Sequence, residues 1–140
     1  MNSHAPPTSR KPRLVIIGGG FAGLSTAAAL SDFPGFITLI DKKNHHTFQP
    51  LLYQVATAGL SPGEIAAPIR GILGKRKNVR VLLGEVTGFD LDRRRVQMQD
   101  IELGYDYLVV AAGAGHSYFG NDQWAELAPG LKTIEDALEI

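Results

Sequence analysis

The pattern of hydrophobic residues near the start of the chain predicts a strand, a helix and a second strand. Residues 13–17 (RLVII) are rich in β-branched side chains and apolar on both faces, which is typical of a strand inside a parallel sheet. Residues 21–30 are rich in alanine and predict a helix that ends before Pro34-Gly35. Residues 36–40 (FITLI) predict the second strand. Together they form a βαβ unit of about 30 residues, the usual size of this motif.

The next segment is less regular. Residues 42–60 show little periodicity, and a loop of this length is usually functional. Ser61 and Glu64 have the spacing of a capping box, and Pro62 suits a first helical turn. We therefore expect a helix from residue 62 to about residue 73.

Four further patterns complete the α/β prediction. They are a third strand at 79–83, an antiparallel meander at 86–90, 95–98 and 101–103, a buried parallel strand at 107–111, and a helix that begins after Thr133. The fold class that we expect is α/β, with a parallel sheet, flanking helices and a small meander. Residues 1–12 hold three prolines and predict a disordered lead-in, and residues 13–140 predict one domain. The helix that begins so close to the last residue suggests a fragment of a longer protein.

Composition narrows the function classes. The 140 residues carry 14 Lys plus Arg and 14 Asp plus Glu, and this zero net charge argues against nucleic acid as a partner. The chain has no cysteine, which excludes disulfides, thiolate metal sites and cysteine nucleophiles. No apolar run is long enough for a membrane span or a secretion signal, so the expected location is cytoplasmic.

The most informative motif is G-x-G-x-x-G, formed by Gly18, Gly20 and Gly23. It follows a predicted strand, opens a predicted helix, and has Asp41 at the end of the second strand, which is the context of a dinucleotide site. Gly18 allows the tight turn, Gly20 allows close approach of a pyrophosphate, and Gly23 allows the helix to pack on the strand. The Asp41 carboxylate can accept hydrogen bonds from ribose hydroxyls and would repel the 2′-phosphate of NADP. The motif alone does not separate FAD from NAD.

Three other patterns favour ordinary structural explanations. Gly59-Leu60-Ser61-Pro62-Gly63 matches the hydrolase motif G-x-S-x-G, but Pro62 lacks the N–H that an oxyanion hole needs. His45 and His46 are adjacent and have few other candidate ligands, so we expect no metal site. The basic runs 75–77 and 93–95 are typical of solvated turns, with an anionic membrane or a missing part of the protein as the alternative.

Several longer stretches resemble the N-terminal part of the type II NADH dehydrogenases (NADH:quinone oxidoreductases), members of the pyridine nucleotide-disulfide oxidoreductase-like flavoproteins. The matching stretches are 15–23 (VIIGGGFAG), 41–46 (DKKNHH), 48–59 (FQPLLYQVATAG), 83–86, 105–111 and 130–133. The resemblance implies a Rossmann-like FAD-binding domain over residues 13–140. It therefore implies FAD as the cofactor.

The resemblance also implies roles for individual residues. Backbone groups of the first motif would hold the FAD pyrophosphate, Asp41 with Lys42 would lie at the adenosine ribose, and Val86 would meet the adenine. Ala112 replaces the threonine usual before Gly113, which removes a hydroxyl beside the cofactor. The implied cofactor-binding residues are Gly18, Gly20, Phe21, Ala22, Gly23, Asp41, Lys42, Gln49, Leu52, Val86, Ala112 and Gly113. No catalytic residue and no metal ligand is assigned.

For the whole parent protein, the resemblance implies hydride transfer from NADH to FAD and electron transfer to a quinone. It implies a peripheral position on the inner face of the cell membrane through a missing C-terminal region, and it leaves a homodimer open. The chain of 140 residues alone is expected to be inactive. The alternatives are a related flavoprotein, such as a sulfide:quinone oxidoreductase, and a non-enzymatic module that binds NAD or another nucleotide.

Overall fold

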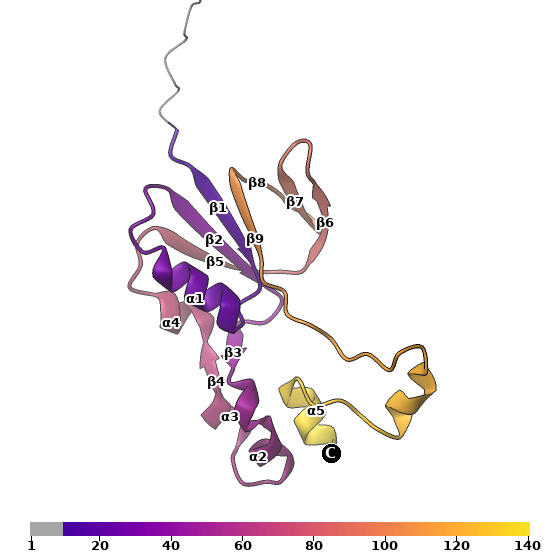
Figure 1. Ribbon diagram of the computed structural model, residues 1–140. Helices are drawn as coiled ribbons and strands as arrows, with labels where there is room; N and C mark the ends of the chain where they lie inside the picture. Colours follow the sequence, from indigo (N-terminus) through magenta and orange to yellow (C-terminus); the bar gives the residue numbers. More distant parts are fainter. Residues whose placement is uncertain (1–9) are drawn as a thin grey trace, which may run out of the picture.

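The computed structural model describes residues 10–140, so most of the predicted lead-in, residues 1–9, lies outside the described residues. The fold is a mixed α/β architecture built on a four-stranded parallel sheet with strand order β5-β2-β1-β9 (Figure 1). Its strands are β1 (Arg13–Ile17), β2 (Phe36–Asp41), β5 (Val79–Leu83) and β9 (Tyr107–Val110). The predicted fold class and all four parallel strands are confirmed.

Strand β1 occupies the interior of the sheet because it pairs on both sides. Leu14 lies opposite Ile37 of β2 and opposite Tyr107 of β9. Strand β9 forms an edge among the described residues, and Tyr107 and Val110 are 59% and 62% exposed. The prediction that β9 is buried is therefore wrong for these two side chains.

The two faces of the sheet have different covers (Figure 1). Helices α1 (Phe21–Ala29) and α4 (Ile69–Leu73) lie on one face. The opposite face packs against the meander, whose strands are β6 (Val86–Asp90), β7 (Arg95–Met98) and β8 (Glu102–Gly104). Successive side chains of β1 point to opposite faces of the sheet, so Ile16 packs toward the helices and Val15 packs toward the meander. This alternation explains why residues 14–17 of the strand are all apolar.

The segment between β2 and β5 differs most from the prediction. Residues 42–60 contain β3 (His45–Thr47), the short 3₁₀ helix η1 (Gln49–Leu51) and α2 (Leu52–Ala56). The helix expected over residues 62–73 is divided into α3 (Pro62–Ile65) and α4 by β4 (Ala66–Pro68), which pairs antiparallel with β3. The physical reason is Pro68, which has no N–H and disfavours a helical conformation in the residue before it.

A separate apolar cluster joins α2 and α3 to the end of the chain. Helix α5 (Ile134–Glu139) follows a 3₁₀ helix, η2 (Asp122–Glu126), and a linking segment. The buried residues of this cluster are Leu52, Val55, Ile65 and Ala137. Across residues 10–140, no helix has the length and hydropathy needed to span a membrane.

Candidate functional site

The turn between β1 and α1 brings two backbone segments into close contact. Gly18 has a φ of +101°, and a Cβ there would collide with the carbonyl oxygen of Ala111 at the end of β9. A Cβ on Gly23 would collide with the carbonyl oxygen of Gly18. A Cβ on Gly20, by contrast, would meet nothing within 4 Å. The first and last glycines of the motif thus close the turn, and the middle glycine leaves its outer side open.

Helix α1 begins directly at this open side. Its N-cap is Gly20, and no side chain caps the helix. The first N–H groups of a helix have no partner within the helix and carry the positive end of its dipole. The first turn of α1 is therefore suited to an anionic group such as a pyrophosphate.

Asp41 lies beside the turn and is held by two backbone N–H groups. Its Oδ2 accepts a hydrogen bond from the Gly19 N–H at 2.5 Å, and its Oδ1 accepts one from the Lys43 N–H at 2.6 Å. Each carboxylate oxygen has a second acceptor position. The carboxylate is thus fixed in orientation and can still accept hydrogen bonds from two neighbouring hydroxyls.

These features line a cavity of about 870 Å³ at the carboxyl ends of the parallel strands. This is where open α/β sheets bind ligands, and the volume lies within the usual range for small-molecule sites. Ten of the twelve predicted cofactor residues line the cavity: Gly18, Gly20, Phe21, Ala22, Asp41, Lys42, Gln49, Val86, Ala112 and Gly113.

The other two predicted residues lie behind the cavity wall. Gly23 is a buried residue of α1 that faces the turn, and its lack of a side chain allows α1 to pack closely against the Gly18 carbonyl group. Leu52 is only 2% exposed and belongs to the cluster with Ala137 of α5. The Leu52 side chain packs toward α5 and does not line the cavity.

The chain's last segment supplies cavity residues that the sequence analysis did not assign, namely His116, Lys132, Thr133 and Asp136. Lys132 Nζ donates hydrogen bonds to the carbonyl oxygens of Ala114 and Gly115 at 2.9 and 3.0 Å. The sequence predicted a helix that begins after Thr133, and the structure shows a capping box there, formed by Thr133 and Asp136. The sequence pattern predicts the start of the helix but not its position at the cavity.

Asp136 is the cavity carboxylate with a displaced pKa. The Lys132 N–H donates a hydrogen bond to Oδ2 at 2.8 Å, and the Thr133 N–H donates a second at 2.9 Å. The Lys132 hydrogen bond is the main reason that the pKa of Asp136 lies below its ordinary value, with Thr133 and His116 contributing. Asp136 therefore stays ionised at neutral pH and adds negative charge near His116, whose Nε2 lies 3.7 Å from it.

Two contacts tie the last segment to the β2–α2 region. Lys43 Nζ forms an ion pair with Glu135 at 2.6 Å. Gln49 Nε2 donates a hydrogen bond to the Lys132 carbonyl oxygen at 3.1 Å. The cavity is therefore bounded on one side by residues far apart in the sequence.

The adjacent histidines have structural partners. His46 Nδ1 lies 3.2 Å from the Gly19 carbonyl oxygen, and its ring meets Phe21 edge-on at 4.8 Å. His45 lies 3.3 Å from Asn44 Oδ1. Over residues 10–140, no group of three or more His, Asp or Glu side chains is arranged to hold a metal ion.

Comparison with curated proteins gives high similarity to type II enzymes. The chain is 52% identical over 147 aligned positions to a Mycobacterium tuberculosis type II NADH:quinone oxidoreductase, Ndh, covering 100% of this chain and 32% of that protein. It is 56% identical to NdhA of the same organism, covering 91% of this chain and 28% of the relative. The chain thus spans about a third of the length of these relatives.

Solved structures share the fold. NDH2 from Plasmodium falciparum in complex with NADH matches with a TM-score of 0.84 and 29% identity, covering 94% of this chain and 28% of that one. A sulfide:quinone oxidoreductase from Aquifex aeolicus matches with a TM-score of 0.82 and 30% identity, covering 91% of this chain and 30% of the other. A family model for pyridine nucleotide-disulphide oxidoreductases matches residues 12–140. The glycine turn, the oriented Asp41 and this match over nearly the whole length together show that the chain belongs to the pyridine nucleotide-disulphide oxidoreductase family.

Proposed function

We propose that this chain is the FAD-binding part of a type II NADH:quinone oxidoreductase. The observation that carries the proposal is the Asp41 carboxylate, held by the Gly19 and Lys43 N–H groups at the mouth of the glycine turn. This arrangement suits an adenosine ribose next to a pyrophosphate. The identity of 52% and 56% to type II NADH:quinone oxidoreductases supports the choice of enzyme class.

The chemistry of the cavity residues suits FAD. The open side of Gly20 and the uncapped first turn of α1, at Phe21 and Ala22, would hold the pyrophosphate. Asp41, with Lys42 beside it, would hold the ribose, and Val86 would lie at the adenine. Gln49, Ala112 and Gly113 would line the flavin side of the cavity. Leu52 would support this wall only indirectly, through its packing against α5.

FAD, when bound, supplies the acceptor for hydride from NADH and the donor of electrons to the quinone. The chain's own residues bind and orient the cofactor, and we assign none of them a catalytic role. Because the chain spans about a third of its relatives, we expect no turnover from these 140 residues alone. The parent protein would act from a peripheral position on the inner face of the cell membrane, through regions beyond this chain, and a homodimer remains open.

Two alternatives make different predictions. A sulfide:quinone oxidoreductase shares the fold, but the Aquifex structure is 30% identical, well below the curated type II relatives. A non-enzymatic NAD-binding module would use the same glycine turn. It would bind NAD more tightly than FAD, which makes the choice measurable.

The test is calorimetric titration of the purified chain with FAD and, separately, with NAD. We expect FAD to bind more tightly than NAD. Preference for NAD would overturn the proposal in favour of a nicotinamide-binding module.

The assigned ribose contact is tested by Asp41→Ala, with His46→Ala as the matched control. Both side chains contact the Gly19 backbone, but only Asp41 offers a carboxylate to the ribose. We expect Asp41→Ala to weaken FAD binding by about tenfold or more, since a hydrogen bond to a charged group contributes about 1.5–3 kcal/mol. His46→Ala should have a smaller effect. Identical titration curves for the two variants would count against the contact.

A further inference from the structure

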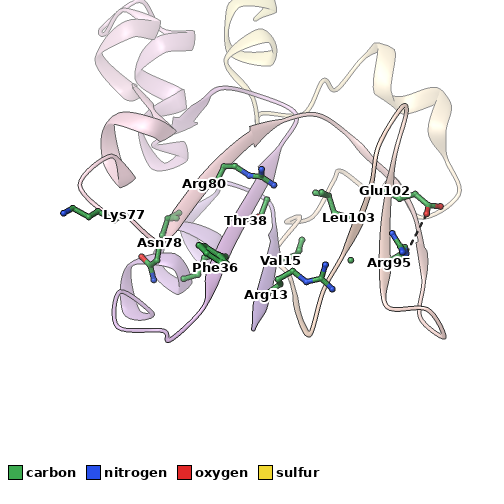
Figure 2. A pocket seen from close by; sticks show the side chains of 13 residues that line it. Arg13, Val15, Phe36, Thr38, Lys77, Asn78, Arg80, Arg95, Glu102 and Leu103 are labelled. Atoms are coloured by element: carbon green, nitrogen blue, oxygen red, sulfur yellow. Dashed lines mark ion pairs between the residues drawn. The ribbon is translucent and has the colours of Figure 1, made fainter. Parts of the chain in front are cut away.

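A second cavity lies at the end of the parallel sheet opposite the cofactor cavity. It has a volume of about 460 Å³ and lies between the first residues of β1, β2 and β5 and the meander strands β7 and β8. Figure 2 shows side chains from the sheet, among them Arg13 and Arg80, and side chains from the meander, Arg95 and Glu102, around one space. None of its lining residues belongs to the cofactor cavity.

The lining of this second cavity is strongly basic. Its lining residues include four cationic ones, Arg13, Lys77, Arg80 and Arg95, and one carboxylate, Glu102, with the Lys77 ammonium pointing outward (Figure 2). Four positive charges and one negative charge leave an excess of three, although the whole chain has zero net charge. Both basic runs noted in the sequence contribute, through Lys77 and Arg95, so the fold gathers separate charges at one place.

Two of these four cations have a carboxylate within 4.0 Å, and the other two have none among the described residues. Arg95 lies 4.0 Å from Glu102, and Arg13 Nε lies 3.7 Å from Asp106, which also binds Arg10 at 2.7 Å. The side chains of Lys77 and Arg80 make no ion pair or hydrogen bond with any residue in 10–140. Uncompensated cations around one concave surface raise the local concentration of anions.

The backbone makes room for the guanidinium of Arg13. A Cβ on Gly104 would lie 3.0 Å from Arg13 Nη2 and 3.1 Å from Nη1. Because Gly104 has no side chain, the planar end of Arg13 lies directly against β8. Its Nη atoms make no hydrogen bond within the described part of the chain, and they remain available as donors to an anion.

An aromatic ring completes the lining. Phe36 is 55% exposed at the start of β2, and Lys11 Nζ lies 5.6 Å from the ring centroid. The Thr38 hydroxyl also lines the cavity, two residues farther along the strand. An exposed aromatic face beside cations is the combination on which nucleobases stack next to their phosphates.

We propose that this cavity is a second anion site that binds a diphosphate or triphosphate group, separately from the cofactor cavity. A phosphate group carries about 1.5–2 negative charges at neutral pH, so two linked phosphates come closest to cancelling the excess of three positive charges. Arginine binds phosphate through paired N–H donors, and three arginines from three strands surround this cavity. Two sources offer the chemistry, namely inorganic pyrophosphate and the phosphate chain of a nucleotide.

The test is titration of the ¹⁵N-labelled chain with sodium pyrophosphate at physiological salt, followed by backbone amide and arginine Nε–H resonances. We expect the largest shifts at Arg13, Arg80, Arg95 and Gly104. Shifts confined to residues 18–22 would place pyrophosphate in the cofactor cavity alone and would overturn the proposal. The result is independent of whether FAD binds.

Arg80→Gln is the critical variant, and Arg93→Gln is its matched control. Arg93 lies in the meander turn with a side chain 81% exposed, outside the cavity, so both variants lose one positive charge from the surface. We expect Arg80→Gln to raise the pyrophosphate Kd by about tenfold and Arg93→Gln to change it less than about twofold. An equal loss of pyrophosphate affinity in the two variants would indicate non-specific attraction by net charge and would overturn the proposal.

Titration of the ¹⁵N-labelled chain with ADP distinguishes a nucleotide from inorganic pyrophosphate as the natural ligand. Tighter binding of ADP than of pyrophosphate at the Arg80 resonances, reduced to equality by Phe36→Leu, would assign the site to nucleotides. Equal affinity in the unaltered chain would assign it to inorganic pyrophosphate. Both outcomes support a diphosphate site, and the absence of shifts at Arg80 with either compound would overturn it.

Discussion

At Gly23 the backbone of α1 lies against the turn that follows β1, with no room for a side chain. The nearest atoms to an added Cβ would be the carbonyl oxygen and carbonyl carbon of Gly18, with the Ile16 Cγ2 atom third at 3.4 Å. A backbone carbonyl cannot rotate away as a side chain can. The closeness of these two segments is therefore a fixed requirement of the fold.

We expect Gly23→Ala to lower the free energy of unfolding by about 2 kcal/mol, because one added methyl group forces a backbone shift. The matched control is Gly63→Ala in α3, where an added Cβ meets nothing within 4 Å. That variant should be unchanged or about 0.5 kcal/mol more stable, since alanine lowers the entropy of the unfolded chain. Urea denaturation measures both, and equal stability of the two variants would contradict the steric argument.

The glycine motif and Asp41 illustrate what a sequence reveals at the residue scale. Spacing and sequence context were enough to predict the turn, because Gly18 and Gly23 lie where a side chain would collide with backbone and Gly20 lies on the open side. The hydrogen bonds from the Gly19 and Lys43 N–H groups to Asp41 could not be predicted. They depend on where β2 ends relative to the turn, which is a matter of strand register.

At the scale of elements, α5 is attached to the rest of the molecule mainly through α2. Leu52 and Val55 of α2 pack with Ile65 and Ala137 in a cluster separate from the two clusters on the sheet. The polar contacts that support it, such as the Lys43–Glu135 ion pair, are exposed. Exposed ion pairs contribute at most about 1 kcal/mol, so apolar packing dominates this attachment.

Leu52→Ala should cost about 3 kcal/mol locally, as buried leucine truncations usually do. We expect faster amide hydrogen exchange in residues 52–56 and 134–139, with β1 and β2 still protected. Leu138→Ala is the control, because Leu138 is 65% exposed and should leave exchange unchanged. Equal loss of protection throughout the sheet would show that the cluster and the sheet unfold as one unit.

The elements that were predicted correctly have strong local signals. The apolar runs of β1, β2 and β5 and the alanine-rich α1 need no distant partner to be identified. Strands β3 and β4 have three residues each and exist only because they pair with one another. Pro68 is a local signal against the helix predicted over residues 62–73, because proline disrupts a helix interior.

For the molecule as a whole, several carboxylates are held in the charged form by the fold. The Arg13 N–H is the main cause of the lowered pKa of Asp106, and the Ser61 N–H is the main cause of the lowered pKa of Glu64. The Lys43 side chain is the main cause of the lowered pKa of Glu135. Protons therefore bind the unfolded chain more readily than the folded chain as the pH falls through the ordinary carboxylate range.

We therefore expect these carboxylates to contribute a nearly constant amount to the free energy of unfolding from about pH 5 to pH 8. At pH values below about 4, that contribution should decrease. The contribution is complete above the ordinary pKa values, 3.8 for Asp106 and 4.5 for Glu64, and is lost as the pH falls through the lowered values. Urea midpoints measured across this range test the expectation. The Asp106→Asn variant should lose less stability on acidification than the unaltered chain. The same decrease in urea midpoint at low pH in both proteins would contradict the assigned role of Asp106.

The arrangement of distant segments was beyond prediction from the sequence. Nothing in residues 130–140 indicates that they return to the cavity beside Lys43 and Gln49, because the contacts join positions 83 and 92 residues apart. The second, basic cavity could not be predicted from the sequence for the same reason. Its arginines are separated along the chain and meet only after the meander folds over the sheet.

The central place of β1 has a consequence for synthesis of the protein. Arg13 and its partner Asp106 are 93 residues apart, and β9 completes the sheet only after both have been made. At about 5–20 residues per second, a ribosome needs roughly 5–20 s to bridge that interval. During this time one edge of an apolar strand is open to other nascent chains. The order of the strands thus leaves β1 without its second partner until β9 has been synthesised.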